Sequence, residues 1–252
     1  MYNKIKTSLF TPSKIIEFIN DKWTFIWLYF FMLVLILLIP NVIIHTTSKG
    51  FNPYQYQNLD YFVKNELRVK GQIENYELNI ESGYHGRFDR FDFIVTNDNL
   101  QMDLSSAHMI VMSKYSIKYI FNQIEVSSKT YQELGLENYD FADKTTANKR
   151  KLITVIDDFY EANKSSIIPF IVVEEAIVIA MDILIFIVII SVFNFKPIPF
   201  KFKFKINLYA ATIYVLLNLF ATLTQIGLLS YIGIILMFIY SNRAFRRVIS
   251  IR

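Results

Sequence analysis

The chain of 252 residues contains no cysteine, which excludes disulfide bonds and thiolate metal sites. Charged residues are also scarce, at 19% of the chain against about 25% in an average soluble domain. Hydrophobic residues make up 53%, and they are gathered into long uncharged runs. Such runs are typical of membrane spans, so the composition predicts an integral membrane protein associated with the lipid bilayer.

The sequence also has no recognisable catalytic motif. It contains no P-loop, dinucleotide fingerprint, nucleophile elbow or H-E-x-x-H pair. Its three histidines, His45, His85 and His108, lie far apart, and none forms a spaced pair on a predicted helix. The charged segment 85–90 is interpreted as an exposed hairpin loop. We therefore expect a protein that is not an enzyme and that holds no cofactor or metal.

Acidic residues are missing where basic residues cluster. The segments 195–206 and 243–252 each carry four basic residues and no acid, and the first 22 residues carry four lysines and two acids. In contrast, the long segment 45–168 has 14 basic and 17 acidic residues. By the positive-inside rule, the three short basic segments are cytoplasmic and segment 45–168 lies outside. This asymmetry indicates orientation in a membrane and gives no reason to expect nucleic acid as a partner.

These patterns predict an α-helical membrane protein with four transmembrane helices, whose two termini are cytoplasmic. A small α+β extracytoplasmic domain with an antiparallel sheet is inserted between helices 1 and 2. The predicted segments are, in chain order, a cytoplasmic interfacial helix (1–22), helix 1 (24–44), the β-rich domain (45–166), helix 2 (167–195), a basic loop (196–206), helix 3 (207–226), helix 4 (228–242) and a basic tail (243–252). A re-entrant hairpin over 208–240 is the alternative to the last two spans.

The N-terminal segment has the signals of a helix start. Thr11 is a candidate N-cap, Pro12 suits the first helical position, and Phe10 is placed to pack on Ile15 as a hydrophobic staple. The segment is interpreted as a helix lying at the membrane surface, or alternatively as a cytoplasmic helix bound to a partner.

Segment 45–168 contains runs rich in β-branched and aromatic residues, which predict strands. The runs are Tyr76–Ile80, Phe91–Thr96, His108–Met112 and Lys118–Val126. Turn residues punctuate them at Gly83, Gly86, 97–99 and 122–123. Apolar residues at helical spacing then predict a helix over 146–163 that leads into the second span.

Carboxylates inside the second predicted span are the most unusual residues of the chain. Glu174 and Glu175 are placed near the outer leaflet, whereas Asp182 lies near the middle of the span. Such residues usually face protein or water, because a carboxylate in hydrocarbon is costly. Asn218 of the third span is a candidate hydrogen-bond partner for Asp182. Three roles stay open: polar contact between helices, an interface with a partner protein, or a site for a proton, cation or substrate.

The basic cytoplasmic segments are candidate contact sites for lipid or a partner. Lysines alternate with phenylalanines in the loop, and arginines recur in the tail. The candidate residues are Lys201, Lys203, Lys205, Arg243, Arg246 and Arg247. They are suited to anionic headgroups or to a cytoplasmic partner. A plain positive-inside loop is the alternative.

Several short segments together resemble a family of uncharacterised membrane proteins of low-GC Gram-positive bacteria, some of them called maltodextrin-utilisation (MalA-like) proteins. The resemblance covers the opening Ser8-Leu9-Phe10-Thr11-Pro12-Ser13-Lys14, the span ending at Pro40, the segments 76–83 and 93–97, and the hairpin around 108–126. This chain departs from the family pattern at Ser82 and at Thr96. The resemblance supplies no catalytic residues to carry over.

The resemblance implies a link to carbohydrate uptake. We therefore expect an accessory or regulatory component of a membrane complex, with membrane-transporter subunits as candidate partners. A sensor of an extracytoplasmic ligand and a small transporter that uses Asp182 are the alternatives. The sequence leaves the oligomeric state open.

Overall fold

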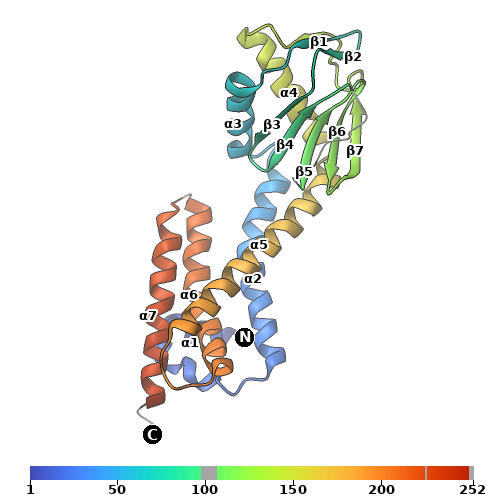
Figure 1. Ribbon diagram of the computed structural model, residues 1–252. Coiled ribbons are helices and arrows are strands. Elements are labelled where there is room, and N and C mark those ends of the chain that lie inside the picture. The colour runs from blue at the N-terminus through green and yellow to red at the C-terminus, as the bar shows by residue number, and fades with distance from the viewer. Residues whose placement is uncertain (98–106, 225, 250–252) are drawn as a thin grey trace. The chain divides into compact units, whose positions relative to one another are not determined.

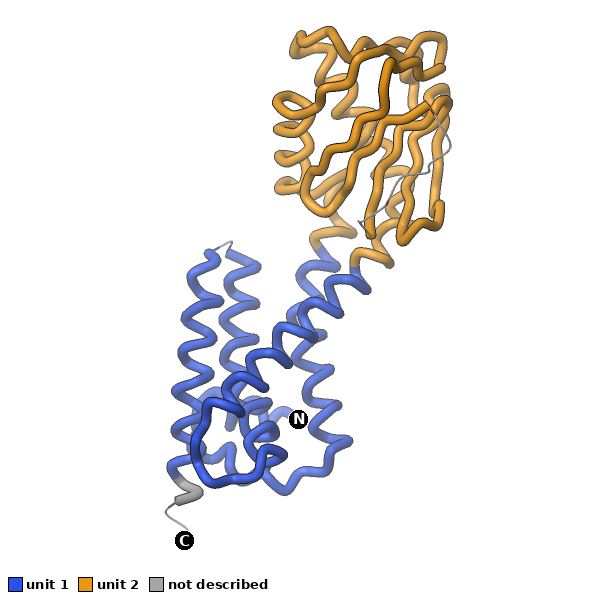
Figure 2. The backbone as a smooth tube through the Cα atoms, in the orientation of Figure 1, with its two compact units in different colours: residues 1–43, 172–252 blue, residues 44–171 orange. Residues whose placement is uncertain are grey.

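The computed structural model describes residues 1–97, 107–224 and 226–249, with side chains up to Arg246. The chain divides into two compact units, which are coloured separately in Figure 2. The membrane unit comprises residues 1–43 and 172–252, and the sheet unit comprises residues 44–171. The predicted fold class is confirmed: four long apolar helices are present, and an α+β region lies between the first and the second of them.

The membrane unit contains the four helices that are long and apolar enough to cross a membrane. They are α2 (Trp23–Thr47), α5 (Lys164–Phe193), α6 (Phe200–Thr224) and α7 (Leu228–Ile249), and the first turns of α5 and the last of α2 belong to the sheet unit (Figure 1). A helix of 25 residues reaches about 37 Å, which exceeds the roughly 30 Å of hydrocarbon in a bilayer. The protein is therefore a multi-pass membrane protein.

The four spans differ in how much of their surface the chain itself covers. Of the most apolar 18 residues of each helix, 61% are buried in α6 but only 22% in α5. Helix α6 packs along α7, where Gly233 lets the two backbones approach: a Cβ at this glycine would lie 3.2 Å from Cα of Tyr214. Helix α5 consequently presents most of its apolar surface away from its own chain.

The N-terminal segment differs from its prediction. Instead of one helix it forms α1 (Tyr2–Phe10) and a 3₁₀ helix, η1 (Pro12–Phe18), which are separated at Thr11. Pro12 does occupy the start of the second helix, but the Thr11 side chain makes no cap hydrogen bond, and Phe10 is 76% exposed rather than packed as a staple. Tertiary contacts decide this region, because α1 and η1 pack on α6 and Tyr240 of α7 donates to the Leu9 carbonyl at 3.0 Å.

The basic loop and tail are largely helical. Helix α6 begins at Phe200 within the predicted loop, and α7 continues to Ile249, beyond the predicted end of the last span. The alternating lysines and phenylalanines from 200 to 205 form the first turns of α6, where Phe204 and Lys205 are both buried.

The sheet unit contains two sheets (Figure 1). The smaller is antiparallel, in the order β2-β1-β8, with bounds β1 (Gly71–Glu74), β2 (Glu77–Ile80) and β8 (Tyr139–Asp140). The larger has the order β3-β4-β5-β6-β7, with bounds β3 (Tyr84–Phe88), β4 (Phe91–Val95), β5 (His108–Met112), β6 (Ser116–Phe121) and β7 (Ile124–Thr130). Its β4–β5 pair is parallel and its other pairs are antiparallel. Most of the turn predicted at 97–99 lies outside the described residues.

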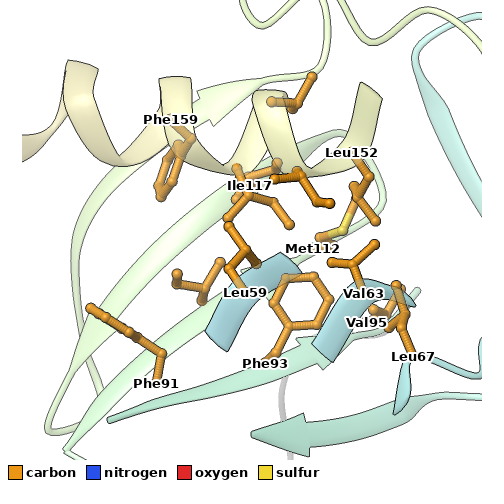
Figure 3. Close-up of a cluster of buried hydrophobic side chains, with 14 of the residues drawn as sticks. Leu59, Val63, Leu67, Phe91, Phe93, Val95, Met112, Ile117, Leu152 and Phe159 are labelled. Atoms are coloured by element: carbon orange, nitrogen blue, oxygen red, sulfur yellow. The ribbon is translucent and has the colours of Figure 1, made fainter. Parts of the chain in front are cut away.

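Three helical elements cover one face of the larger sheet: α3 (Pro53–Tyr61), the π-helical turn η2 (Phe62–Glu66) and α4 (Thr146–Ala162). Figure 3 shows Leu152 and Phe159 of α4 and Leu59 of α3 directed toward Phe93 of the sheet. Each of these four side chains is fully buried. A cysteine-free unit of this size is stabilised by such a core, at about 1.5–3 kcal/mol for each large apolar side chain.

Helix α3 was not predicted, although its start carries a clear signal. Asn52 accepts a hydrogen bond from the Gln55 backbone at 3.0 Å, and the Gln55 side chain accepts from the Asn52 backbone at 3.4 Å. Pro53 occupies the first helical position. An Asn-Pro-x-Gln sequence is therefore a reciprocal capping box, with both N-terminal preferences satisfied.

The entry of the chain into the sheet unit is held by α4. The backbone N–H groups of Gly50 and Phe51 donate to Glu161 and Asp157, both at 2.7 Å. The Gly50 hydrogen bond holds the pKa of Glu161 below its usual range, whereas burial raises the pKa of Asp157. Gly50 has a φ of +62°, and its close approach to Asp157 leaves no space for a side chain.

The segment 85–90 is the predicted hairpin loop only at its last two residues. Its first four residues belong to strand β3, and only Asp89 and Arg90 form the turn into β4. His85 is paired with the buried Asp92 of β4, with 3.3 Å between His Nε2 and Asp Oδ2. The glycine and charged residues had suggested a loop, but residues 85–88 pair with β4 and belong to the edge strand of the larger sheet.

Candidate functional site

Asp182 lies deep within α5 and on its exposed side. It is 11 residues before the last residue of the helix, Phe193, which corresponds to roughly 16 Å along the axis. Side chains three or four residues apart share a helix face, and the neighbours of Asp182 on this face are Val178, Ile185 and Ile189. These three are 52%, 45% and 44% exposed, and Asp182 is exposed with them. The carboxylate therefore interrupts an apolar stripe that the chain itself leaves exposed.

The inward face of α5 is occupied by other residues. Ile183, Ile187 and Ile190 are at most 6% exposed and belong to the core of the membrane unit. Asp182, in contrast, projects from a part of the helix that the chain leaves uncovered. The geometry of α5 thus separates an inward packing face from an outward face that carries an acid.

The structure does not join Asp182 to its predicted partner Asn218. The Asn218 side-chain carbonyl accepts a hydrogen bond from Ser230 of α7 at 2.7 Å, so this asparagine connects α6 and α7. Glu174 and Glu175 are partly buried and lie about two turns earlier in α5. Of the four residues predicted as one intramembrane site, Asn218 is thus bonded to α7, and the three acids follow one another along about two turns of α5.

Polar contact between the spans is supplied by other residues, which the sequence analysis did not identify. Asn207 of α6 donates to Ser191 of α5 at 2.7 Å and accepts from Ser241 of α7 at 2.5 Å. All three are at most 1% exposed. The available signal was an isolated amide and two hydroxyls near the ends of three apolar runs, which need one another in a low-dielectric interior.

A second polar contact joins α2 to α6. The hydroxyls of Tyr29 and Thr212 are 2.7 Å apart, and the rings of Tyr29 and Tyr209 lie 4.7 Å apart. The Tyr209 hydroxyl also donates to the Asp21 carboxylate, which accepts from Lys4 as well. Asn207, Asn218 and Tyr29 thus each form a hydrogen bond between spans.

The lysines of the predicted cytoplasmic contact site divide into structural and exposed residues. Lys205 is 7% exposed and donates to the Asp21 backbone carbonyl at 2.5 Å. Lys203 donates to the Asn194 carbonyl at 2.5 Å, which ties the start of α6 to the end of α5. Lys201 is exposed, with its ammonium 4.9 Å from the centre of the Phe202 ring. Of the three, Lys201 is the one available to headgroups or a partner.

The arginines at the end of α7 are described in part. Arg243 and Arg246 are both exposed and lie three residues apart on the same side of the helix. The Arg247 side chain lies outside the described residues. Two exposed cations at the end of a membrane span are suited to contact with anionic headgroups.

Neither a search for metal-binding side chains nor comparison with known proteins indicates what chemistry the protein carries out. Within the part of the chain that the structure describes, no group of three or more His, Asp or Glu side chains is placed to hold a metal ion. Comparison with protein-family models, with curated proteins and with solved structures finds no match.

Proposed function

We propose that the protein is a non-enzymatic accessory or regulatory component of a membrane complex, and that α5 binds a transmembrane helix of a partner protein through Asp182. The observation that carries this proposal is the outward position of Asp182 on α5, whose most apolar 18 residues are only 22% buried by their own chain. Insertion of such an acid at the centre of a span costs about 2.5–3.5 kcal/mol. A helix that presents a hydrogen-bond donor to Asp182 offsets this cost.

The chemistry of the partner follows from the stripe around Asp182. A fitting partner is a membrane helix with a lysine, arginine or amide side chain at mid-span, flanked by small or apolar residues. Its donor satisfies the carboxylate, and its apolar surface packs on Val178, Ile185 and Ile189, which are otherwise exposed. The resemblance to maltodextrin-utilisation proteins supports a carbohydrate importer as the complex in question.

This proposal predicts different results for two substitutions at one position. Asp182→Leu removes the acceptor, and we expect it to reduce recovery of the partner at least tenfold. Asp182→Asn keeps an oxygen acceptor and is expected to retain most of it. The measurement is affinity purification of the tagged, crosslinked protein from its native membranes in mild detergent, with quantitative mass spectrometry of the proteins recovered.

The matched control is Met181→Leu, which changes an exposed neighbour on the same helix and leaves the acid in place. Recovery of transporter subunits with wild type and Met181→Leu, but not with Asp182→Leu, would establish the proposal. Equal recovery with all variants would contradict it. Loss of solute flux in Asp182→Asn, with the complex intact, would favour the transporter instead.

Orientation is predicted by the charge pattern and can be measured separately, because the wild-type chain has no cysteine. Single cysteines at two exposed positions, Ser128 in β7 and Lys201 in α6, provide the test. With the sheet unit outside and the termini in the cytoplasm, Ser128→Cys reacts with a membrane-impermeant maleimide in intact cells. Lys201→Cys reacts only after permeabilisation. The reverse pattern would overturn the assigned orientation.

A further inference from the structure

Two adjoining hollows lie along η2 and α4 in the sheet unit. One has a volume of about 600 Å³ and the other of about 630 Å³, and both are open to solvent. They share Lys64 of η2 as a lining residue. Together they form an open groove, called here the basic groove, on the surface of the unit.

The lining of the basic groove is strongly cationic. Six basic residues line it against one acidic residue, Asp60. The six are Lys64, Arg68, Lys70, Lys144, Lys149 and Arg150. The surrounding segment 45–168 has 14 basic and 17 acidic residues, so its average composition does not produce this wall. Positive charge has been segregated to one concave surface.

The groove is held in shape by bonds that leave most of its charge uncompensated. Lys149 donates to the Lys64 carbonyl at 2.9 Å, and Lys144 donates to the Phe141 carbonyl at 3.0 Å. A carbonyl fixes the position of an ammonium group without cancelling its charge. Lys64 is the exception, because it pairs with Asp60 at 2.7 Å.

The segment that follows η2 presents two more cations outward. Leu67 and Val69 are 7% and 5% exposed and alternate with the exposed Arg68 and Lys70. This alternation anchors the backbone by its apolar side and directs the basic side chains away from the core. In the described part of the chain, no carboxylate lies within salt-bridge distance of Arg68 or Lys70.

The backbone at the centre of the groove has an uncommon conformation. Residues Phe62–Glu66 form a single π-helical turn, closed by the hydrogen bond from the Leu67 N–H to the Phe62 carbonyl at 2.9 Å. Isolated π-turns are rare and frequently occur at functional sites. Here the turn carries Lys64, whose side chain and carbonyl both take part in the wall of the groove.

From this arrangement we infer that the basic groove binds a linear polymer that carries phosphate groups along its chain. The groove is open and extends over two hollows, so it fits an extended chain better than a small molecule. Its cations are distributed along its length, and the guanidinium of Arg68 matches the geometry of a phosphate oxygen pair. Exposed Tyr56 of α3 adds an aromatic wall at one end.

The test uses the full-length protein in neutral detergent and fluorescently labelled inorganic polyphosphate as the probe. We expect the double variant Arg68→Gln/Lys70→Gln to bind the probe at least tenfold more weakly than wild type. The salt dependence, as the slope of log K against log salt concentration, should become shallower by about two, because two phosphate contacts are lost. Both residues are exposed, so the fold is retained, which hydrogen exchange of the sheet unit checks.

The control is Lys114→Gln/Lys129→Gln, which removes the same charge from an exposed and a half-exposed position outside the groove. We expect it to change affinity less than twofold. Equal weakening of probe binding by the two double variants would contradict a binding site in the groove, because general charge attraction would then explain the binding. Full displacement of the probe by inorganic phosphate at the same phosphate concentration would contradict a polymeric ligand and indicate that the groove binds free phosphate. Full displacement by anionic phospholipid vesicles at that concentration would instead indicate that it binds lipid headgroups.

Discussion

The substitution Gly71→Ala is expected to lower the free energy of unfolding of the sheet unit by about 3 kcal/mol or more. Gly71 begins β1 with a φ of +142°, a conformation that side chains rarely adopt. A Cβ there would lie 2.3 Å from the Asn79 carbonyl oxygen and 2.7 Å from Cα of Ile80. Both are backbone atoms of β2, so the collision cannot be relieved by a rotamer change.

The consequence of this collision extends across the smaller sheet. Strand β1 is its central strand, and the Gly71 carbonyl accepts a hydrogen bond from Phe141, directly after β8. Displacement of β1 therefore weakens both of its pairings. Hydrogen-exchange mass spectrometry of the full-length protein measures this as lost protection of β1, β2 and β8.

The matched control is Gly135→Ala. Gly135 also has a positive φ, +65°, but nothing lies within 4 Å of a Cβ built on it. Only the backbone strain of about 1 kcal/mol is then expected. A similar loss of protection in the two variants would show that conformation, and not collision with β2, limits position 71.

A second large effect is expected in the membrane unit, where Asn207→Leu should lower stability by about 2 kcal/mol. The asparagine is fully buried and hydrogen-bonded to Ser191 and Ser241, so leucine removes both interhelical bonds at once. It also leaves both serine hydroxyls facing an apolar side chain. We expect α5 and α7 to separate more readily from α6.

Tryptophan fluorescence is the suitable measurement for this variant. The two tryptophans of the chain, Trp23 and Trp27, are both in α2 of the membrane unit, and each ring lies within 6.3 Å of the Phe204 ring of α6. A thermal transition followed by their emission reports the membrane unit and not the sheet unit. Its midpoint should fall in Asn207→Leu.

Thr224→Val is the control for the loss of a polar group from the same helix. Thr224 is exposed, and its hydroxyl bonds only within α6, to the Phe220 carbonyl at 2.7 Å. Its midpoint should stay close to that of wild type. Equal shifts in the two variants would contradict a special role for the bond between Ser191, Asn207 and Ser241.

The spans and most strands were accessible from sequence because they are local patterns. Long apolar runs and β-branched segments are legible without knowledge of any tertiary contact. The parallel pairing of β4 with β5 could not be predicted from the sequence, since it depends on the direction in which the chain returns to the sheet. The break at Thr11 depends likewise on packing against α6.

The candidate sites show a similar division. Asp182 was identified because one acid stands out in an apolar run, but its outward direction was not predictable. Helix α5 is apolar on all sides, so its sequence does not distinguish the inward face. The basic groove was missed because its cations come from segments 64–70 and 144–150, which meet only in the folded unit.

The order of the core elements along the chain also determines when the sheet unit can fold during synthesis on the ribosome. Leu59 of α3 and Phe159 of α4 belong to one core although about 100 residues separate them. At about 5–20 residues per second, the ribosome needs roughly 5–20 s to supply α4 after α3. During this interval α3 and most strands have been synthesised but cannot yet pack against α4, while α2 is already complete. The nascent chain thus spends several seconds as a substrate for chaperones and proteases, with its first membrane span made before its domain can fold.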